Sequence, residues 1–282
     1  MQTLNFIYPE RSSIRFERFV FPDGQPHLRL DLATVNQDES SCRVICRIAN
    51  PSDLLMVLFA KNALEELGIA EVELEIAYLM AARMDRLMNE GEAFSLRVVA
   101  TMLNTANFKK VTIFDPHSDV STALIQRSKA ITNIEFVGKV LNDAASRFPT
   151  MLTKGYCLVS PDAGALKKIY QVAKALGVEQ VVECIKHRDV RTGKLSGFKV
   201  LEDDLQGKTC FVVDDLCDGG ATFIGLAKEL KARNAGDILL VVSHGVFSKG
   251  FLLEGIKHSY TTNSFQDFTA EVEGLTVLEY QN

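Results

Sequence analysis

The chain has 282 residues, of which 47% are hydrophobic and 24% charged, so a collagen-like or wholly disordered protein is excluded. Its 31 basic and 36 acidic side chains give a net charge of −5, which disfavours nucleic-acid binding through bulk positive charge. At roughly 100–200 residues per domain, the length predicts one or two domains.

Several local features predict a cytoplasmic protein without a membrane segment. The longest obvious apolar run, residues 54–60, is far shorter than the roughly 20 residues that a membrane span requires. Residues 1–10 lack the basic stretch and apolar core of a signal peptide. The six cysteines are scattered, mostly among apolar neighbours, and none forms a C-x-x-C pair. We therefore expect buried free thiols and no zinc site.

The first half of the chain alternates predicted strands and helices. An apolar strand over 44–48 precedes a helix that begins at Pro51-Ser52-Asp53 and ends at Gly68. A strand over 72–77, a helix over 92–103 and a strand over 111–114 follow.

The second half repeats this pattern. Strands are predicted over 157–159, 181–185, 210–213 and 238–242, and helices over 166–176 and 222–233. Short connections between alternating elements predict an α/β fold with parallel sheets covered by helices. Residues 110–117 and 208–215 have similar patterns, so we expect two similar domains, 1–142 and 143–282.

The segment 211–222 carries the strongest chemical signal. An apolar strand leads into Asp214 and Asp215, then Asp218, two glycines and Thr222. Glycines let successive backbone N–H groups converge on a phosphate, and the following helix adds the positive end of its dipole. The carboxylates can accept hydrogen bonds from sugar hydroxyls. The segment therefore predicts a site for a phosphorylated sugar.

This segment resembles the phosphoribosyl-diphosphate (PRPP) motif of type I phosphoribosyltransferases and of ribose-phosphate diphosphokinases. The resemblance implies two tandem phosphoribosyltransferase-like domains, each a mostly parallel sheet flanked by helices. It also implies a ribose-phosphate site formed by seven residues of the C-terminal domain: Asp214, Asp215, Asp218, Gly219, Gly220, Ala221 and Thr222.

Other motifs separate the two families and favour the diphosphokinases. Residues 83–86 (Arg-Met-Asp-Arg), followed by Gly-Glu-Ala at 91–93, resemble a diphosphokinase motif, and two guanidinium groups just after a strand can bind polyphosphate. Residues 21–25 (Phe-Pro-Asp-Gly-Gln) resemble a loop that reaches the adenine of ATP on a neighbouring subunit. The resemblance assigns ATP binding to the N-terminal domain, through Phe21, Asp23, Gln25, Arg83, Met84, Asp85 and His117.

The remaining motifs concern the metal and the catalytic loop. Residues 115–118 (Asp-Pro-His-Ser) and 160–165 (Ser-Pro-Asp-Ala-Gly-Ala) resemble family sites on the metal–ATP side, which implies metal roles for His117 and Asp162. The polar segment 186–197 resembles the family's flexible catalytic loop, with Lys186 and Arg188 as its Lys-x-Arg pair. We therefore expect Lys186, Arg188 and Asp218 to be catalytic.

The resemblance implies an enzyme that transfers the diphosphoryl group of ATP to the anomeric hydroxyl of ribose 5-phosphate, giving PRPP and AMP. Mg²⁺ is the implied cofactor, ATP is the co-substrate, and a homo-oligomer, dimer or hexamer, is the implied assembly. Neither nucleic acid nor membrane is an expected partner.

Three alternatives stay open. Gln25 and Met84 stand where the family has Glu and Gln, and the phosphate loop 219–222 reads Gly-Gly-Ala-Thr where the family has Thr-Gly-Gly-Thr. The altered loop admits a larger acceptor such as ADP-ribose. A PRPP-consuming phosphoribosyltransferase is disfavoured by the Arg83–Arg86 and Lys186–Arg188 motifs. A non-catalytic homologue is disfavoured because the lysine, the arginine and the three acids are all present.

Overall fold

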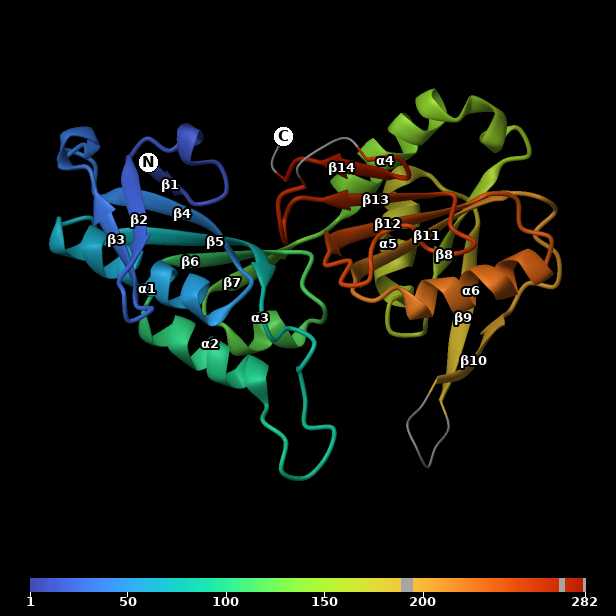
Figure 1. Ribbon diagram of the computed structural model, residues 1–282, viewed down its shortest axis with the longest axis horizontal. Coiled ribbons are helices and arrows are strands. Elements are labelled where there is room, and N and C mark those ends of the chain that lie inside the picture. Colours follow the sequence, from blue (N-terminus) through green and yellow to red (C-terminus); the bar gives the residue numbers. More distant parts are fainter. Residues whose placement is uncertain (189–194, 269–271, 281–282) are drawn as a thin grey trace. The chain divides into compact units, whose positions relative to one another are not determined.

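The chain folds into two compact units, residues 1–132 and 133–282, seen in a computed structural model that describes residues 1–188, 195–268 and 272–280 (Figure 1). The observed boundary between the units, after residue 132, therefore precedes the predicted boundary near Asn142. It falls inside helix α4 (Ile134–Arg147), whose buried Phe136, Val137 and Val140 pack in the core of the second unit. No helix among the described residues is long and apolar enough to cross a membrane.

The first unit is built on five parallel strands in the order β1-β4-β5-β6-β7. Three helices pack on one core, and a two-stranded antiparallel hairpin, β2-β3, is inserted between β1 and β4. The strands are β1 (Gln2–Asn5), β2 (Phe16–Val20), β3 (Pro26–Leu30), β4 (Ser41–Ile48), β5 (Glu71–Leu79), β6 (Lys110–Phe114) and β7 (Ser128–Ile131), and the helices are α1 (Pro51–Glu66), α2 (Ser95–Thr105) and α3 (Val120–Leu124), with short 3₁₀ turns at Pro9–Arg11 and Leu32–Thr34.

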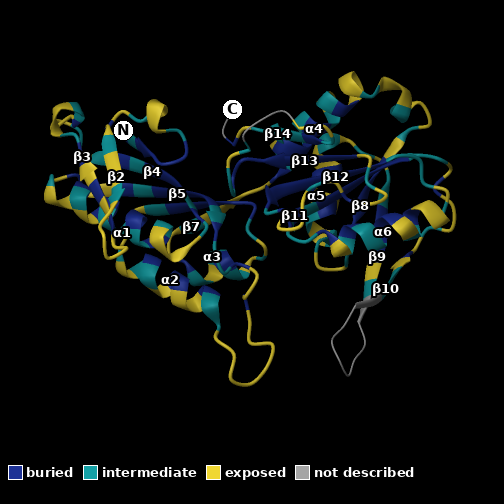
Figure 2. Ribbon diagram, viewed as in Figure 1, coloured by how far each residue is buried: buried dark blue, intermediate teal, exposed yellow. Residues whose placement is uncertain are grey.

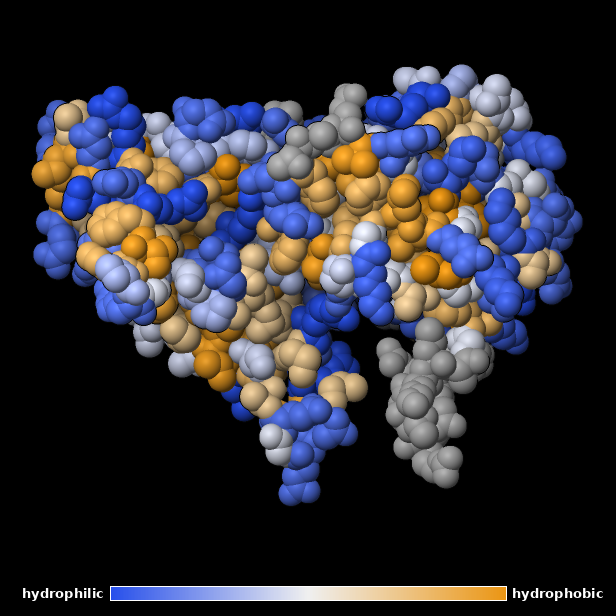
Figure 3. Space-filling view, viewed as in Figure 1, coloured by the Kyte–Doolittle hydropathy of each residue, from blue (hydrophilic) through white to orange (hydrophobic). Residues whose placement is uncertain are grey.

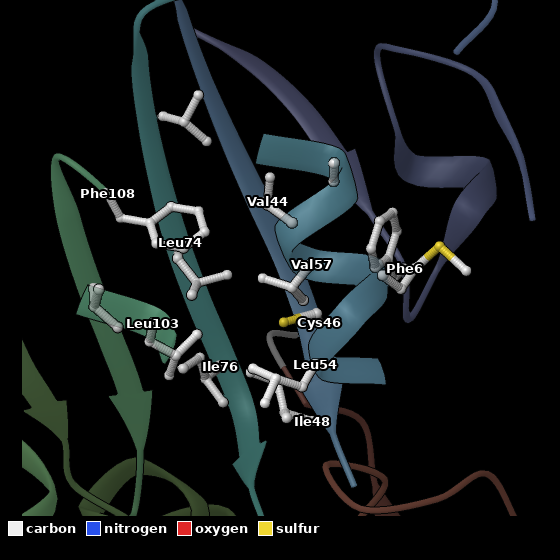
Figure 4. Packing of buried hydrophobic residues seen from close by; sticks show 14 of the residues in the cluster. Phe6, Val44, Cys46, Ile48, Leu54, Val57, Leu74, Ile76, Leu103 and Phe108 are labelled. Atoms are coloured by element: carbon white, nitrogen blue, oxygen red, sulfur yellow. The ribbon is translucent and has the colours of Figure 1, made fainter. Parts of the chain in front are cut away.

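The two faces of this sheet differ in character because side chains alternate along each strand. On β4, Val44 and Cys46 point into an apolar core with Leu54 and Val57 of α1 (Figure 4). The opposite face is charged, with Arg43 Nη2 lying 3.2 Å from Glu73 Oε2. Helix α1 begins as predicted at Pro51, since Asn50 and Asp53 form a capping box around it.

The second unit has a seven-stranded sheet in the order β10-β9-β8-β11-β12-β13-β14, in which only the β9–β10 pair is antiparallel. Helices α4 and α5 cover one face and α6 the other, so the central strands are buried on both faces (Figure 2). The remaining elements are a 3₁₀ turn at Pro149–Leu152, β8 (Tyr156–Ser160), α5 (Leu166–Leu176), β9 (Val181–Arg188), β10 (Leu195–Val200), β11 (Thr209–Cys217), α6 (Ala221–Ala232), β12 (Ile238–Gly245), β13 (His258–Thr262) and β14 (Leu275–Leu278).

The strand order of the second sheet reverses direction between β8 and β11. From β8 the chain first adds β9 on one side, and from β11 it adds β12 and β13 on the other. Connections that leave neighbouring strands in opposite directions open a crevice at the carboxyl ends of the strands, where open α/β sheets bind ligands. The fold therefore places the predicted sugar-phosphate segment, which follows β11, at such a crevice.

The predicted α/β alternation is confirmed, with corrections at several ends. Strand β11 continues to Cys217, so Asp214 and Asp215 lie within the strand and not after it. Helix α6 begins at Ala221, one residue before the predicted start. The predicted loop 186–197 is partly β-structure, because β9 continues to Arg188 and β10 begins at Leu195, while residues 189–194 lie outside the description.

The six cysteines are free and buried, as predicted. Cys157 of β8 and Cys210 of β11 face each other in register, with their sulfur atoms 3.7 Å apart. Burial raises the pKa of Cys42 and of Cys184 to about 12, so both thiols stay protonated at neutral pH.

A close backbone approach before β12 yields a stability prediction. A Cβ atom at Gly236 would lie 2.4 Å from the carbonyl oxygen of Gly207 and 3.0 Å from that of Lys208. We expect Gly236→Ala to lower the free energy of unfolding by about 1–3 kcal/mol, because the backbone must shift to admit the methyl group. Urea denaturation measures this loss. The control is Gly197→Ala, where a Cβ atom meets nothing within 4 Å, and equal losses in both variants would contradict the prediction.

Candidate active site

Lys186 and Asp162 form an ion pair at the carboxyl ends of β9 and β8. Lys186 Nζ lies 2.6 Å from Asp162 Oδ2, and the Ala165 backbone N–H donates to Asp162 Oδ1 at 3.0 Å. Burial acts to raise the pKa of Asp162, but the hydrogen bond and charge of Lys186 outweigh it and hold that pKa below its ordinary value. Asp162 is therefore ionised at neutral pH.

Asp214 and Asp215 lie beside this pair on β11. Asp215 is buried, and its backbone N–H donates to Asp214 Oδ1 at 2.9 Å. Desolvation raises the pKa of Asp214 well above its ordinary value, and the charges of Asp215 and Asp162 raise it further. The structure thus brings together four of the predicted residues, Lys186, Asp162, Asp214 and Asp215, at the crevice between β8 and β11.

The predicted phosphate loop joins β11 to helix α6. Gly220 takes a left-handed conformation, with a φ of 74°, at the N-cap, where the side chain of a non-glycine residue would also meet Leu253 Cδ2 at 2.4 Å. Within the described part of the chain, no side chain caps this helix end. Its first-turn N–H groups, including that of Thr222, therefore suit an anionic ligand.

The connection between β12 and β13 contributes residues that sequence reasoning missed. Ser248 Oγ donates a hydrogen bond of 2.5 Å to Asp218 Oδ1, and Lys249 Cδ lies 3.4 Å from the position a Cβ atom of Gly219 would take. A signal was available, because the polar residues 248–249 follow β12 at the same end of the sheet as the phosphate loop. The strand neighbours themselves could not be known from the sequence.

In the first unit, a second polar cluster follows β5 and β6. The buried Asp85 carboxylate accepts hydrogen bonds from Arg86 Nε at 2.7 Å, Arg86 Nη2 at 3.1 Å and Ser118 Oγ at 2.7 Å. The Arg86 hydrogen bonds are the main cause that lowers the pKa of Asp85, and the charge of His117 lowers it further. The predicted residues Asp85 and His117 are therefore neighbours.

Arg83 and Met84 precede this cluster on an exposed segment. Ala81, with a left-handed φ of 63°, turns the chain after β5, and the Met84 N–H donates to the Ala81 carbonyl at 2.8 Å. The loop then projects from the first unit before α2, and its tip is hydrophilic (Figures 1 and 3). Both side chains are exposed at the surface of the first unit.

Phe21, Asp23 and Gln25 lie at the tip of the β2–β3 hairpin. The Gln25 N–H donates to Asp23 Oδ1 at 3.1 Å, and the Phe21 N–H donates to the Gln25 carbonyl at 2.9 Å. The Phe21 ring is 42% exposed and lies 5.2 Å from the Phe19 ring, centroid to centroid. The hairpin therefore presents an aromatic surface and polar groups to the outside.

The donor set bears on the predicted magnesium ion. Among the described residues, no group of three or more His, Cys, Asp or Glu side chains could hold a metal ion. Mg²⁺ is commonly held by one or two carboxylates together with substrate phosphates and water, a mode that the Asp162 carboxylate fits. The imidazole of His117 is a softer ligand than Mg²⁺ prefers. The predicted His117 and Asp162 belong to different units.

Comparison with known proteins identifies similar sequences and folds. The family described as phosphoribosyl transferase domain matches residues 130–279. The ribose-phosphate pyrophosphokinase of Pyrococcus abyssi is 29% identical over 271 residues, covering 92% of this chain and 86% of the relative. That of Thermococcus kodakarensis is 30% identical over 241 residues, covering 82% and 77%.

A solved structure extends the comparison to the fold. The crystal structure of phosphoribosylpyrophosphate synthetase from Mycobacterium smegmatis superposes with a TM-score of 0.78 at 22% identity, covering 94% of this chain and 86% of that one. The predicted fold of two phosphoribosyltransferase-like domains is thereby confirmed.

The raised pKa of Asp214 generates a pH prediction. The folded protein keeps this proton at pH values where the unfolded chain has lost it. The contribution of Asp214 to the free energy of unfolding is therefore most favourable at low pH and declines as the pH rises above 3.8. We expect Asp214→Asn to increase the free energy of unfolding at pH 7, because asparagine has no charge to bury beside Asp215 and Asp162. The gain should shrink toward pH 4 in urea titrations.

The control for this prediction is Asp203→Asn, which changes an exposed carboxylate of the same unit. A stability gain in Asp214→Asn that does not depend on pH would contradict the assignment, as would a loss that grows with pH.

Proposed function

The chain belongs to the ribose-phosphate pyrophosphokinase family, and from this premise we propose that it transfers the diphosphoryl group of ATP to ribose 5-phosphate, giving PRPP and AMP. As a member of this family the chain is an enzyme, an ATP-dependent diphosphotransferase. One observation carries the proposal: Lys186, Asp162 and Asp214 converge at the crevice next to an uncapped helix N-terminus.

The second unit is suited to the sugar phosphate. Asp214 and Asp215 would accept hydrogen bonds from the 2- and 3-hydroxyls of ribose, which favour the ionised carboxylates. The loop Gly219 to Thr222 would bind the 5-phosphate through backbone N–H groups and the helix dipole. Asp218, held by Ser248, would lie beside the reacting end of the sugar.

The transfer depends on positive charge that neutralises the phosphate oxygens, and it requires no covalent intermediate with the protein. The anomeric oxygen forms a bond to the β-phosphorus of ATP, the bond from that phosphorus to the oxygen of AMP breaks, and the hydroxyl proton leaves to solvent. Lys186, now paired with Asp162, would exchange that partner for phosphate oxygens and neutralise their developing charge. Arg188 is proposed for the same role from its motif alone, because its side chain lies outside the description.

The first unit is suited to the nucleotide. Arg83 and Arg86 would bind the polyphosphate, and Phe21 would pack against the base with Asp23 and Gln25 as polar partners. Met84, Asp85 and His117 complete the proposed ATP-binding set. When bound, Mg²⁺ would neutralise part of the phosphate charge, and Asp162 and His117 are proposed for metal roles from their motifs. We also propose a homo-oligomer in the cytoplasm, since the hairpin motif acts across subunits in the family.

One observation favours a second candidate, the same transfer to a larger 5-phosphate ester such as ADP-ribose. At Gly219 the space next to the loop is bordered by the flexible side chain of Lys249, and no backbone atom lies among its nearest neighbours there. A substituent on the acceptor phosphate could therefore be accommodated by a movement of one side chain.

Product analysis tests both candidates. We expect incubation with ATP, Mg²⁺ and ribose 5-phosphate to give PRPP and AMP in equal amounts, detected by mass spectrometry. A parallel incubation with ADP-ribose measures the alternative, and a strong preference for either acceptor decides between them. The proposed reaction would be overturned if no AMP formed with either acceptor. It would also be overturned if the protein consumed PRPP and a nucleobase in the absence of ATP.

A substitution tests the proposed role of Lys186. We expect Lys186→Ala to lower kcat by about 100- to 1,000-fold, because one preorganised cation is lost from the transition state. The control, Lys228→Ala, removes an exposed lysine from helix α6 and should leave the rate unchanged. Unaltered AMP release by the Lys186 variant would refute a catalytic role for the lysine.

A further inference from the structure

We propose that Lys249 is a substrate-binding residue that supplies the side-chain cation of the acceptor phosphate site. The inference rests on the proposed function and adds a residue from the β12–β13 connection, outside the phosphate loop itself. It identifies the ligand group as the phosphate on the 5-oxygen of the acceptor sugar.

The connection is anchored by hydrogen bonds to the last residue of β11 and to the Gln266 side chain. The N–H groups of Val246 and Phe247 both donate to the Cys217 carbonyl, at 2.9 and 3.0 Å. Gln266 Nε2 donates to the carbonyls of Gly245 and Val246 at 3.1 Å each. Four hydrogen bonds among three segments therefore fix the start of the connection next to Cys217, the residue that precedes Asp218.

A tight turn then directs the next two side chains toward the loop. Phe247 has a left-handed φ of 46°, which is rare for a residue with a bulky side chain, and the Gly250 N–H closes the turn on the Phe247 carbonyl at 2.9 Å. The Phe247 ring is buried against Phe251 and Phe268, and this packing holds the backbone in its unusual conformation. Strain of this kind is typical of positions that place functional side chains.

Ser248 and Lys249 at the turn meet successive residues of the loop. Ser248 Oγ donates to Asp218 Oδ1 at 2.5 Å. The Lys249 stem runs alongside Gly219, with Cδ, Cε and Cγ at 3.4, 3.6 and 3.7 Å from the position of a Cβ atom there. Leu253 then packs on Gly220. The connection therefore follows the loop residue by residue, with Lys249 opposite its first glycine.

The charge of Lys249 has no partner among the residues that the structure describes. Its side chain is exposed, and its ammonium group has no hydrogen bond or ion pair with any other described residue. Asp218 of the loop accepts a hydrogen bond from the Ser248 hydroxyl, the neighbour of Lys249 in the chain. A lysine whose stem lies along Gly219, just before the uncapped helix N-terminus, is suited to bind an anion there, and the phosphate of the acceptor is the anion that the proposed reaction brings to this loop.

The arrangement also accounts for the missing hydroxyl at Gly219. A glycine cannot donate a side-chain hydrogen bond to the phosphate, whereas Lys249 reaches the same position from across the loop. The extra positive charge compensates for that loss, and it suits a phosphate monoester dianion and a diphosphate ester alike.

The test measures acceptor binding by calorimetry in wild type, Lys249→Met, Lys249→Arg and Lys257→Met. Methionine keeps the length of the stem without its charge, and Lys257 is an exposed lysine at the amino end of β13, away from the loop. We expect Lys249→Met to weaken ribose 5-phosphate binding by about 10- to 100-fold, with arginine restoring most of the affinity. Lys257→Met should bind as wild type does.

Kinetics and a second acceptor complete the test. The KM for the acceptor should rise by a similar factor in Lys249→Met while the KM for ATP stays unchanged. ADP-ribose is assayed beside ribose 5-phosphate to determine whether the site binds a phosphate monoester or a diphosphate ester. Wild-type affinity in Lys249→Met overturns the inference while the proposed reaction stands. A wild-type protein that binds and turns over neither acceptor overturns the proposed function, and the assignment of Lys249 with it.

Discussion

The reversal of strand order between β8 and β11 is the constraint on which the candidate site depends. Helices on both faces of the second sheet hold its central strands in register, and their connections must diverge where the order reverses. Segments from 160 to 250 in the sequence therefore end at one side of a single sheet. The acids, the lysine and the glycine loop need no special folding device to meet there.

Within this crevice, the same residue type acquires opposite acid–base properties. Asp162 has a cation within hydrogen-bond distance, so its pKa falls, whereas burial, followed by the charges of Asp215 and Asp162, raises the pKa of Asp214. The net charge of −5 does not reveal this difference between the pKa values of the two aspartates. In the proposed function, the anionic substrates depend on the local placement of three cations, Lys186 and Lys249 of the second unit and Arg86 of the first.

The sequence predicted most of the second sheet because its central strands are short apolar runs, such as β12, that alternate with helices of clear periodicity. It did not reveal β13, which reads His-Ser-Tyr-Thr-Thr and is nevertheless buried throughout. Its polar groups are satisfied by partners distant in sequence, such as Asp143 for Tyr260 Oη and the Ser243 carbonyl for Thr262 Oγ1. The position of Lys249 at the phosphate loop could not be predicted for the same reason, since its contact with Gly219 depends on which strands are neighbours.

The proton on Asp214 has a consequence for ligand affinity. Sugar hydroxyls donate to a carboxylate and favour its ionised form, while the surroundings of Asp214 in the ligand-free protein favour the protonated form. If the sugar binds as proposed, we expect occupation of the crevice to be accompanied by release of a proton. We therefore expect the affinity for the proposed sugar substrate to increase as the pH rises through the range where Asp214 titrates, because binding and protonation are thermodynamically linked.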